Sequence, residues 1–398
     1  MKTAYDVIVV GAGPAGSAAA QRAAQAGLDV LLIEKRQEIG VPVRCGEATD
    51  IETTERFMPL DARYINRYIN QYAIIGTAGD RVIVPPSSPT IIIDRKVFDA
   101  ALTHEAARAG ADVRVSTTAL GLLRDDGAVT GVRLKSLGRV CEVRARLVVA
   151  ADGVESQVAR WAGLKTIPPM ADYYVGFQFT LTNLRGRFDP DICEYHIGNE
   201  TVAPGGYVWV FPKSEDSANV GIVIPANRAR PVSPQAWLER FVERFYPGAG
   251  ILSMVAGGIP ITGAIRPMTA DGLVVVGDAA HQADPLTAGG ISLGMIGAEL
   301  AMQVAAPAIK GGDVSARALR EYEALWHERF GKMHGALYAV RKILTRMAEA
   351  DFNRLVAQAA RMPLATMSHA ELITQLLRAH PALLLEARTL ITTGLLLK

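Results

Sequence analysis

Short runs of consecutive apolar residues predict a set of buried strands in this chain. Residues 7–10 and 30–33 are wholly aliphatic, and residues 147–151 and 273–276 have the same apolar character. Such short runs are typical of strands that are covered on both faces of a parallel sheet. The alanine-rich segment 17–26 lies between the first two runs and predicts a helix. The chain therefore opens with a βαβ unit, which indicates an α/β fold.

Apolar and polar residues alternate in the middle third of the chain, which indicates half-buried strands. Several such strands, separated by turn residues, predict an antiparallel sheet laid over the first domain. Tyr207, Trp209 and Phe211 occupy alternate positions of one strand, so their side chains face one side of that sheet. That side either packs into the core or lines a cavity. The alternating segments are residues 174–181, 194–197, 206–211 and 218–224.

The last quarter of the chain has a helical composition. Residues 316–350 are rich in Ala, Leu, Glu and Arg, and a capping box at residues 368–371 precedes a further helical segment. The final apolar stretch, 383–397, is broken by an acidic and a basic residue and is too short to cross a bilayer. It either packs on the protein or on a second subunit, or it lies at a membrane surface as an interfacial helix.

A glycine motif follows the first apolar run. Gly11, Gly13 and Gly16 form G-x-G-x-x-G at the junction of strand and predicted helix, and Glu34 ends the second strand. In such a unit the first glycine permits the tight turn, the second lets the backbone approach a pyrophosphate, and the third brings helix and strand together. The helix N-terminus attracts the phosphates, and Glu34 can accept hydrogen bonds from a ribose diol. The motif in this setting predicts a bound adenine dinucleotide.

Length, charge and cysteine content narrow the class of protein. A chain of 398 residues is too long for one ordinary core, so more than one domain is expected. The net charge of +2, from 42 basic and 40 acidic residues, gives no reason to expect a nucleic-acid partner. Residue 1 leads directly into the first strand, so we expect no signal peptide. Cys45, Cys141 and Cys193 are odd in number and widely spaced, which favours a reducing cytoplasm over a disulfide framework.

No metal site is predicted. Cys193 and His196 form a C-x-x-H pair, but no second pair of ligands accompanies them in the sequence. A structural zinc site needs four ligands, so this pair alone does not indicate one.

The residues at the ends of two further predicted strands distinguish a flavoprotein from an NAD-dependent enzyme. Asp152-Gly153 follows the run at 147–151, and Asp278 follows the run at 273–276. Asp278 can hydrogen-bond a ribityl hydroxyl, and the backbone N–H groups of Gly290 and Ile291, at the start of a predicted helix, can face the N1–C2=O edge of a flavin. Each signal alone is an ordinary turn, whereas all of them in this order favour FAD as the cofactor.

Together these segments resemble the glutathione-reductase-type FAD fold, in the p-hydroxybenzoate hydroxylase class. Residues 42–47, Pro-Val-Arg-Cys-Gly-Glu, and residues 207–213, Tyr-Val-Trp-Val-Phe-Pro-Lys, with Val220-Gly221, resemble the geranylgeranyl reductase family. Within it the archaeal digeranylgeranylglycerophospholipid reductases are most similar. The resemblance runs from Asp6 to the region of Phe330, with a looser helical match beyond.

The resemblance implies a set of FAD contacts and a substrate tunnel. The tunnel would be lined by at least one of Tyr207, Trp209 and Phe211 and would hold an isoprenoid chain. This chain departs from the family at Ala48 and Ala288, where many members have glycine, and each adds a methyl group near the expected flavin edge. The implied FAD contacts, beside Gly11, Gly13 and Gly16, are Ala15, Glu34, Cys45, Gly46, Ala48, Arg95, Ala119, Asp278, Gly290 and Ile291.

Cys45 is the residue that we expect at the reactive edge of the flavin. It follows Arg44, and a neighbouring cation would lower the pKa of its thiol. The other interpretation is a small residue that packs on the isoalloxazine ring.

These observations divide the chain into three parts. Residues 1–165 with 260–312 are expected to form a discontinuous FAD-binding domain, residues 166–259 an antiparallel-sheet substrate domain, and residues 313–398 a helical region.

The resemblance implies an FAD-dependent oxidoreductase of lipid biosynthesis that reduces C=C bonds of geranylgeranyl chains in archaeal-type ether lipids or their precursors. Reduced flavin would deliver hydride, and a proton would complete the reduction. One alternative is a monooxygenase or halogenase of the same fold acting on a small apolar substrate. Another is a flavin-binding redox or lipid-carrier protein without turnover. The sequence has one dinucleotide motif, so the electron donor is either a transiently docked NAD(P)H or a ferredoxin, and peripheral membrane contact is compatible with each arrangement.

Overall fold

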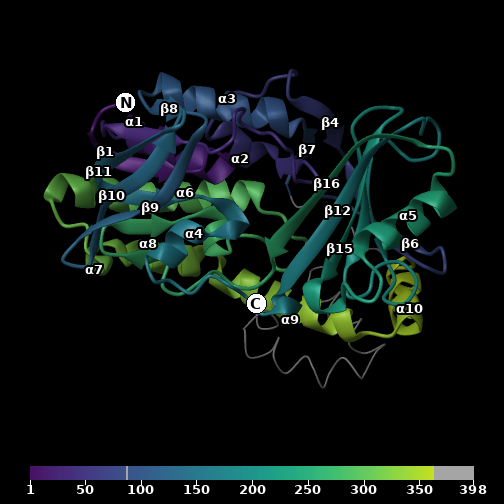
Figure 1. Cartoon of the computed structure of the whole chain (residues 1–398). Helices are drawn as coiled ribbons and strands as arrows, with labels where there is room; N and C mark the ends of the chain where they lie inside the picture. The colour runs from purple at the N-terminus through teal and green to yellow at the C-terminus, as the bar shows by residue number, and fades with distance from the viewer. Residues whose placement is uncertain (87, 363–398) are drawn as a thin grey trace.

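The computed structural model describes residues 1–86 and 88–362, and it contains three sheets. Figure 1 shows the first sheet and its helices on the left and the second sheet on the right, with α5 (Pro234–Phe245) against its outer face. The capping box expected at 368–371 and the apolar stretch 383–397 lie outside the described residues.

The first sheet has eight strands and contains all four apolar runs. In the order β18-β11-β1-β2-β8, neighbouring strands pair in parallel, and the central residues of all but the edge strand β8 are fully buried. β9, β10 and the first half of β11 continue as an antiparallel meander. The four buried strands predicted from the sequence are therefore confirmed. The strands are β1 (Ala4–Val10), β2 (Val30–Ile33), β8 (Asp112–Arg114), β9 (Thr117–Asp125), β10 (Ala128–Ser136), β11 (Arg139–Ala150), β17 (Thr269–Ala270) and β18 (Leu273–Val275).

Helices pack around the first sheet. α1 (Pro14–Gln25) contacts both α3 (Arg95–Arg108) and α6 (Ile291–Gly311), and its alanines are buried except for Ala15, which is partly buried. The short α4 (Gln157–Trp161) follows β11. Within the described part of the chain, α6 alone has the length and apolar composition that could cross a bilayer, but 67% of its apolar window is buried inside the fold.

The second sheet has seven strands in the order β16-β12-β15-β14-β13-β5-β6. The four strands predicted in the middle third are confirmed as β12 to β15, and all neighbours are antiparallel except β13 and β5. Leu238 and Phe241 of α5 close the core on one face. The strands are β5 (Gln71–Gly76), β6 (Arg81–Val84), β12 (Tyr173–Thr182), β13 (Ile192–Ile197), β14 (Tyr207–Pro212), β15 (Ala218–Pro225) and β16 (Gly250–Pro260).

The domain division expected from the sequence needs a correction at β5 and β6. Residues 1–165 were expected to contribute only to the FAD-binding domain, but β5 pairs with β13 and carries β6 into the second sheet. The reason is that pairing between strands far apart in the sequence leaves no mark in the local pattern of either strand.

A small third sheet and the last helices join the two larger sheets. β3 (Ala48–Asp50) pairs with β7 (Thr90–Ile93), which pairs with β4 (Ile65–Ile69), and α2 (Ile51–Glu55) follows β3. Arg341 of α9 bonds to Asp172 at the start of β12 at 2.6 Å, and α10 packs on β5 and β6. The last helices are α7 (Ala316–Leu319), α8 (Glu321–Trp326), a π-helical turn (His327–Gly331), α9 (Lys332–Arg346) and α10 (Glu349–Ala359).

Candidate cofactor and substrate site

The glycine turn between β1 and α1 combines two crowded positions with an open one. A Cβ at Gly11 would lie 2.4 Å from the carbonyl oxygen of Ala151, and a Cβ at Gly16 would lie 1.8 Å from that of Gly11. A Cβ at Gly13 would meet no atom within 4 Å. Gly13 is also the N-cap of α1, where no side chain caps the helix. The first-turn N–H groups therefore remain available to an anion at this end of the helix.

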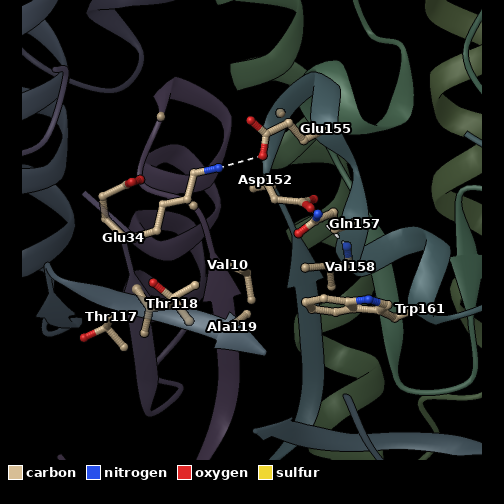
Figure 2. A pocket seen from close by; sticks show the side chains of 16 residues that line it. Val10, Glu34, Thr117, Thr118, Ala119, Asp152, Glu155, Gln157, Val158 and Trp161 are labelled. Carbon is tan, nitrogen blue, oxygen red and sulfur yellow. Dashed lines mark hydrogen bonds and ion pairs between the residues drawn. The ribbon is translucent and has the colours of Figure 1, made fainter. Parts of the chain in front are cut away.

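A cleft of about 240 Å³ opens beside this turn, at the carboxyl ends of β1 and β2. Figure 2 shows Glu34, Thr118 and Ala119 on one side of the cleft and Asp152, Glu155, Gln157 and Trp161 on the other. Oε2 of Glu34 accepts the N–H of Ala12 at 3.0 Å, and its Oε1 accepts the N–H of Arg36 at 2.9 Å. These two bonds fix the carboxylate at the end of the strand, where it can meet a ribose.

A second cavity, of about 170 Å³, continues from the first, and Gly13 and Glu34 line both. Arg95, at the first position of α3, reaches this cavity and forms a bidentate pair with Asp99, with both bonds at 2.7 Å. Burial raises the pKa of Asp99, although Arg95 opposes the shift. The two bonds to Asp99 hold the guanidinium of Arg95 in one orientation.

A third cavity has a volume of about 480 Å³, and its lining includes Cys45, on whose thiol Arg95 of the second cavity acts. Its first wall is the segment 45–50, and its second wall is the start of α6, including Gly290 and Ile291. A Cβ at Gly290 would lie 3.0 Å from Oδ1 of Asp278, so Asp278 lies close to this wall. Burial raises the pKa of Asp278.

The third wall of this cavity is aromatic. Tyr207, Trp209 and Phe211 of β14 all line it, as their alternate spacing predicts. Trp209 donates its Nε1–H to Oε1 of Gln178 at 3.1 Å, and its ring fills the space that a Cβ at Gly221 would need, only 2.1 Å away. The Val-Gly motif in β15 thus leaves room for the indole.

Sequence reasoning missed two aromatic residues of this wall, Tyr195 and Tyr72. The ring of Tyr195 lies 5.5 Å from those of both Tyr207 and Phe211, and Tyr72 packs against Tyr195 at 6.0 Å. Tyr195 lies in a strand that the alternation predicted, so its position was a usable signal. Tyr72 comes from β5, whose pairing with β13 the sequence did not indicate.

The expectation for the thiol of Cys45 is wrong in its cause and in its direction. Arg44 is exposed, and the cation that acts on Cys45 is Arg95. Burial raises the pKa of the Cys45 thiol, and the charge of Arg95 opposes this without reversing it. The reason is that adjacency in sequence sets no distance between side chains that leave the backbone on different sides.

The two departures from the family pattern both lie in the third cavity. Ala48 begins β3 and Ala288 lies in the loop before α6. Ala288 has a φ of +61°, a left-handed conformation that glycine adopts at lower cost. A glycine at this position in related chains therefore has a conformational reason.

Three neighbouring cavities fit a dinucleotide with two different ends. The first has a carboxylate for a ribose, the open position at Gly13 leaves space for a pyrophosphate, and the third places backbone N–H groups of a long helix beside an apolar chamber. The candidate FAD residues named above border these cavities, except Asp278, which lies close to Gly290, Gly16, which shapes the turn, and Ala15, whose Cβ lies near Gly294 of α6.

The C-x-x-H pair belongs to other interactions. Cys193 is fully buried in the core, and His196 pairs with Glu194 at 3.0 Å. Among residues 1–86 and 88–362, no group of three or more His, Cys, Asp or Glu residues could hold a metal ion.

Comparison with known proteins identifies the type of chain. Residues 4–333 match the family model described as FAD binding domain. A digeranylgeranylglycerophospholipid reductase of Methanosarcina acetivorans is 42% identical over 397 residues, which cover 98% of this chain and 97% of the relative. One from Methanothrix thermoacetophila is 41% identical over 390 residues, or 97% and 99% of the two chains.

Solved structures show the same fold. A crystal structure from Thermoplasma acidophilum, described as geranylgeranyl bacteriochlorophyll reductase-like, has a TM-score of 0.91 at 35% identity and covers 97% of this chain and 98% of its own. A flavin-dependent brominase has a TM-score of 0.72 at 21% identity, covering 90% and 93%, and shares the fold alone.

Proposed function

The chain belongs to the digeranylgeranylglycerophospholipid reductase family and carries an FAD-binding domain, and from this premise we propose that it reduces the isoprenoid double bonds of geranylgeranyl chains in ether phospholipids or their precursors. The observation that carries the proposal is the aromatic cavity lined by Cys45 and Gly290, close to Arg95 of the second cleft. The aromatic wall of this cavity suits a hydrocarbon chain.

We assign the parts of FAD to residues of the three clefts. Glu34 would hold the adenosine ribose, with Ala119 on the same wall, and the N-terminus of α1 at Gly13 would bind the pyrophosphate. Arg95 and Asp278 stand where the ribityl chain would run, and the N–H groups of Gly290 and Ile291 would meet the ring. When bound and reduced, FAD supplies the hydride that the reaction requires.

The remaining steps are tasks for the chain's own residues. An isolated alkene has no carbonyl to stabilise charge, so the barrier must be lowered by positioning, by exclusion of water and by a placed proton. The rings of Tyr207, Trp209 and Phe211 would bind and orient the chain. Because burial raises its pKa, Cys45 keeps its proton on Sγ at neutral pH, and we assign it as the catalytic residue at the edge of the chamber.

The partners belong to the same proposal. The electron donor is either NAD(P)H or a ferredoxin. A substrate whose chains reside in a lipid bilayer requires at least transient contact with a membrane surface, so we propose a cytoplasmic enzyme that meets the membrane peripherally.

The mass of the product tests the function. The purified protein would be reduced anaerobically with dithionite and mixed with a geranylgeranyl phospholipid. We expect the lipid to gain about two mass units for each double bond reduced. A gain of about sixteen units, seen only with NAD(P)H and air, would instead establish a monooxygenase. An unchanged lipid under both conditions, with FAD still bound, would indicate a carrier or redox protein.

A further inference from the structure

The two motifs that carry the family resemblance each end in a charged residue to which sequence reasoning gave no role. Glu47 ends the segment 42–47, and Lys213 ends the segment 207–213. In the structure Nζ of Lys213 donates to Oε2 of Glu47 at 2.5 Å, across 166 positions of sequence. The two motifs are therefore joined to each other.

The carboxylate of Glu47 is buried and fully paired. Glu47 is 3% exposed, and the Lys213 side chain is 18% exposed. Oε2 also accepts the side-chain N–H of Asn219 at 2.6 Å, and Oε1 accepts the backbone N–H of Arg95 at 2.7 Å. A buried carboxylate without such partners would be strongly destabilising. The ion pair is therefore part of the interior and not a solvated surface contact.

The backbone around Glu47 is held as tightly as its side chain. Glu47 has a φ of +73°, a left-handed conformation that is unfavourable for glutamate. Its N–H contacts Sγ of Cys45 at 3.2 Å, and its C=O accepts the N–H of Ile93 at 2.8 Å. Asn219 also reaches the carbonyl oxygen of Gly46 at 3.3 Å. The surrounding bonds thus maintain a strained turn at Cys45 and Gly46.

This turn meets the aromatic wall directly. A Cβ at Gly46 would lie 3.0 Å from the ring of Phe211 and 3.3 Å from Nε1 of Trp209. Lys213 follows Phe211 by two positions, and Asn219 lies in the neighbouring β15. The ion pair therefore links the segment 45–50 to the aromatic wall formed by β14, on two sides of the third cavity.

We propose that Glu47 and Lys213, with Asn219, are positioning residues that hold the Cys45–Gly46 turn against the aromatic wall, so that the Cys45 thiol faces the bound chain. The effect of this arrangement on catalysis rests on the proposed function. The charged groups that act on the thiol are Arg95 of α3 and Glu47 of the turn itself. Lys213 neutralises Glu47, so the pair also sets the local charge beside Sγ.

The test replaces each member of the pair in the full-length, FAD-loaded protein. Glu47→Gln and Lys213→Met would be compared by lipid reduction and by the pH dependence of Cys45 alkylation with iodoacetamide, followed by mass spectrometry. Cys45→Ser identifies the alkylated site. Lys2→Met is the matched control, because Lys2 also forms a lysine–carboxylate pair, with Asp29 at 2.7 Å, but this pair is exposed and neither residue lines a cavity described above.

We expect each single variant to lower the rate of lipid reduction about tenfold or more, the usual scale for a charged hydrogen bond. The double variant should be no worse than the poorer single variant, because the two side chains act as a unit. The alkylation midpoint should move to lower pH in Glu47→Gln, which removes a negative charge near the thiol, and to higher pH in Lys213→Met. A residue with only a packing role would not move the two midpoints in opposite directions.

Parental rates and midpoints in both folded variants would overturn the proposal. If a single variant fails to fold, Lys213→Arg decides, because it retains the charge: activity within threefold of the parent is expected, and a folded but inactive protein would overturn it. Alkylation needs no lipid. Failure of the parent to reduce lipid would therefore count against the proposed function, while the midpoints still test the pair.

Discussion

The dinucleotide clefts and the aromatic cavity are built in different ways. The turn that faces the first two clefts lies between β1 and α1, and its fit depends on two missing Cβ atoms. That of Gly16 would meet Gly11 in the same turn, and that of Gly11 would meet Ala151, which follows β11. The aromatic cavity draws side chains from β3, β5, β13, β14 and the start of α6, and its fit depends on large rings. A local motif can thus indicate where a cofactor binds, whereas the aromatic cavity forms only when strands far apart in the sequence pair.

The largest effect should separate the two kinds of glycine in the turn. Gly16→Ala places a methyl group on the carbonyl oxygen of Gly11, so we expect the free energy of unfolding to fall by about 3 to 5 kcal/mol. Gly13→Ala meets open space, and its stability should stay within about 1 kcal/mol of the parent, because alanine is a poorer N-cap than glycine. Because its methyl group enters the cleft, FAD affinity should nevertheless fall. Denaturant unfolding of the apoprotein and FAD titration would measure the two effects.

Equal destabilisation by both substitutions would contradict the distinction. It would mean that Gly13 also serves the packing of the turn and that its open position has no relation to a ligand.

In the aromatic cavity the expected effect on stability is smaller and the effect on activity larger. Trp209→Phe keeps an aromatic ring but leaves Oε1 of Gln178 without its indole donor, which should cost about 1 to 3 kcal/mol. FAD binding should remain at the parental level, and lipid reduction should fall. Thermal unfolding, flavin absorbance and product mass would be recorded together.

Val158→Ala is the matched control for Trp209→Phe, because Val158 lines the first cleft and not the aromatic cavity. It should weaken FAD binding without changing the reduction rate per bound flavin. A Trp209→Phe protein that loses FAD but reduces lipid normally would reverse the assignment of the two regions.

The smallest effect concerns two buried histidines, one directly after Ala280 and one in α9. Burial lowers the pKa of both His281 and His334. Nε2 of His281 bonds to the carbonyl oxygen of Thr166 at 2.7 Å, whereas the two ring nitrogens of His334 have no partner among the described residues. Because their pKa values are lower in the folded state, the unfolded state binds more protons as the pH drops.

Stability should therefore be complete above pH of about 6.5, the ordinary histidine value, and should decline below it. His334→Gln should flatten this decline and change stability at neutral pH by about 1 kcal/mol or less. His281→Gln should flatten it too and should also cost about 1 kcal/mol at neutral pH for the lost bond. Urea unfolding across the pH series gives both numbers, and a slope unchanged in both variants would exclude these residues as its source.

The sequence predicted the parts of the molecule whose signals are local. The apolar runs, the glycine turn with Glu34, and the alternation that brings Tyr207, Trp209 and Phe211 to one face each follow from residues close together in the chain. The motifs 42–47 and 207–213 were recognised as separate segments, and the bond between Glu47 and Lys213 was not foreseen.

What the sequence could not predict depends on long-range contacts. The pairing of β5 with β13 brings Tyr72 into the cavity, and the approach of Arg95 determines which cation acts on Cys45. The thiol pKa shows the physical reason. Burial is the largest cause of the raised pKa of Cys45. The burial comes from several segments packed together, so no single segment of the sequence reveals it.

The parallel pairing of β13 with β5 also has a consequence for biosynthesis. During translation β5 and β6 are synthesised well before residues 192–197. The edge of β5 that pairs with β13 therefore has unpaired backbone groups while most of the cofactor domain is being synthesised. Folding of the substrate chamber is thus delayed until more than half of the polypeptide has emerged. The cofactor domain cannot be cut out as a contiguous piece of gene without exposing that edge.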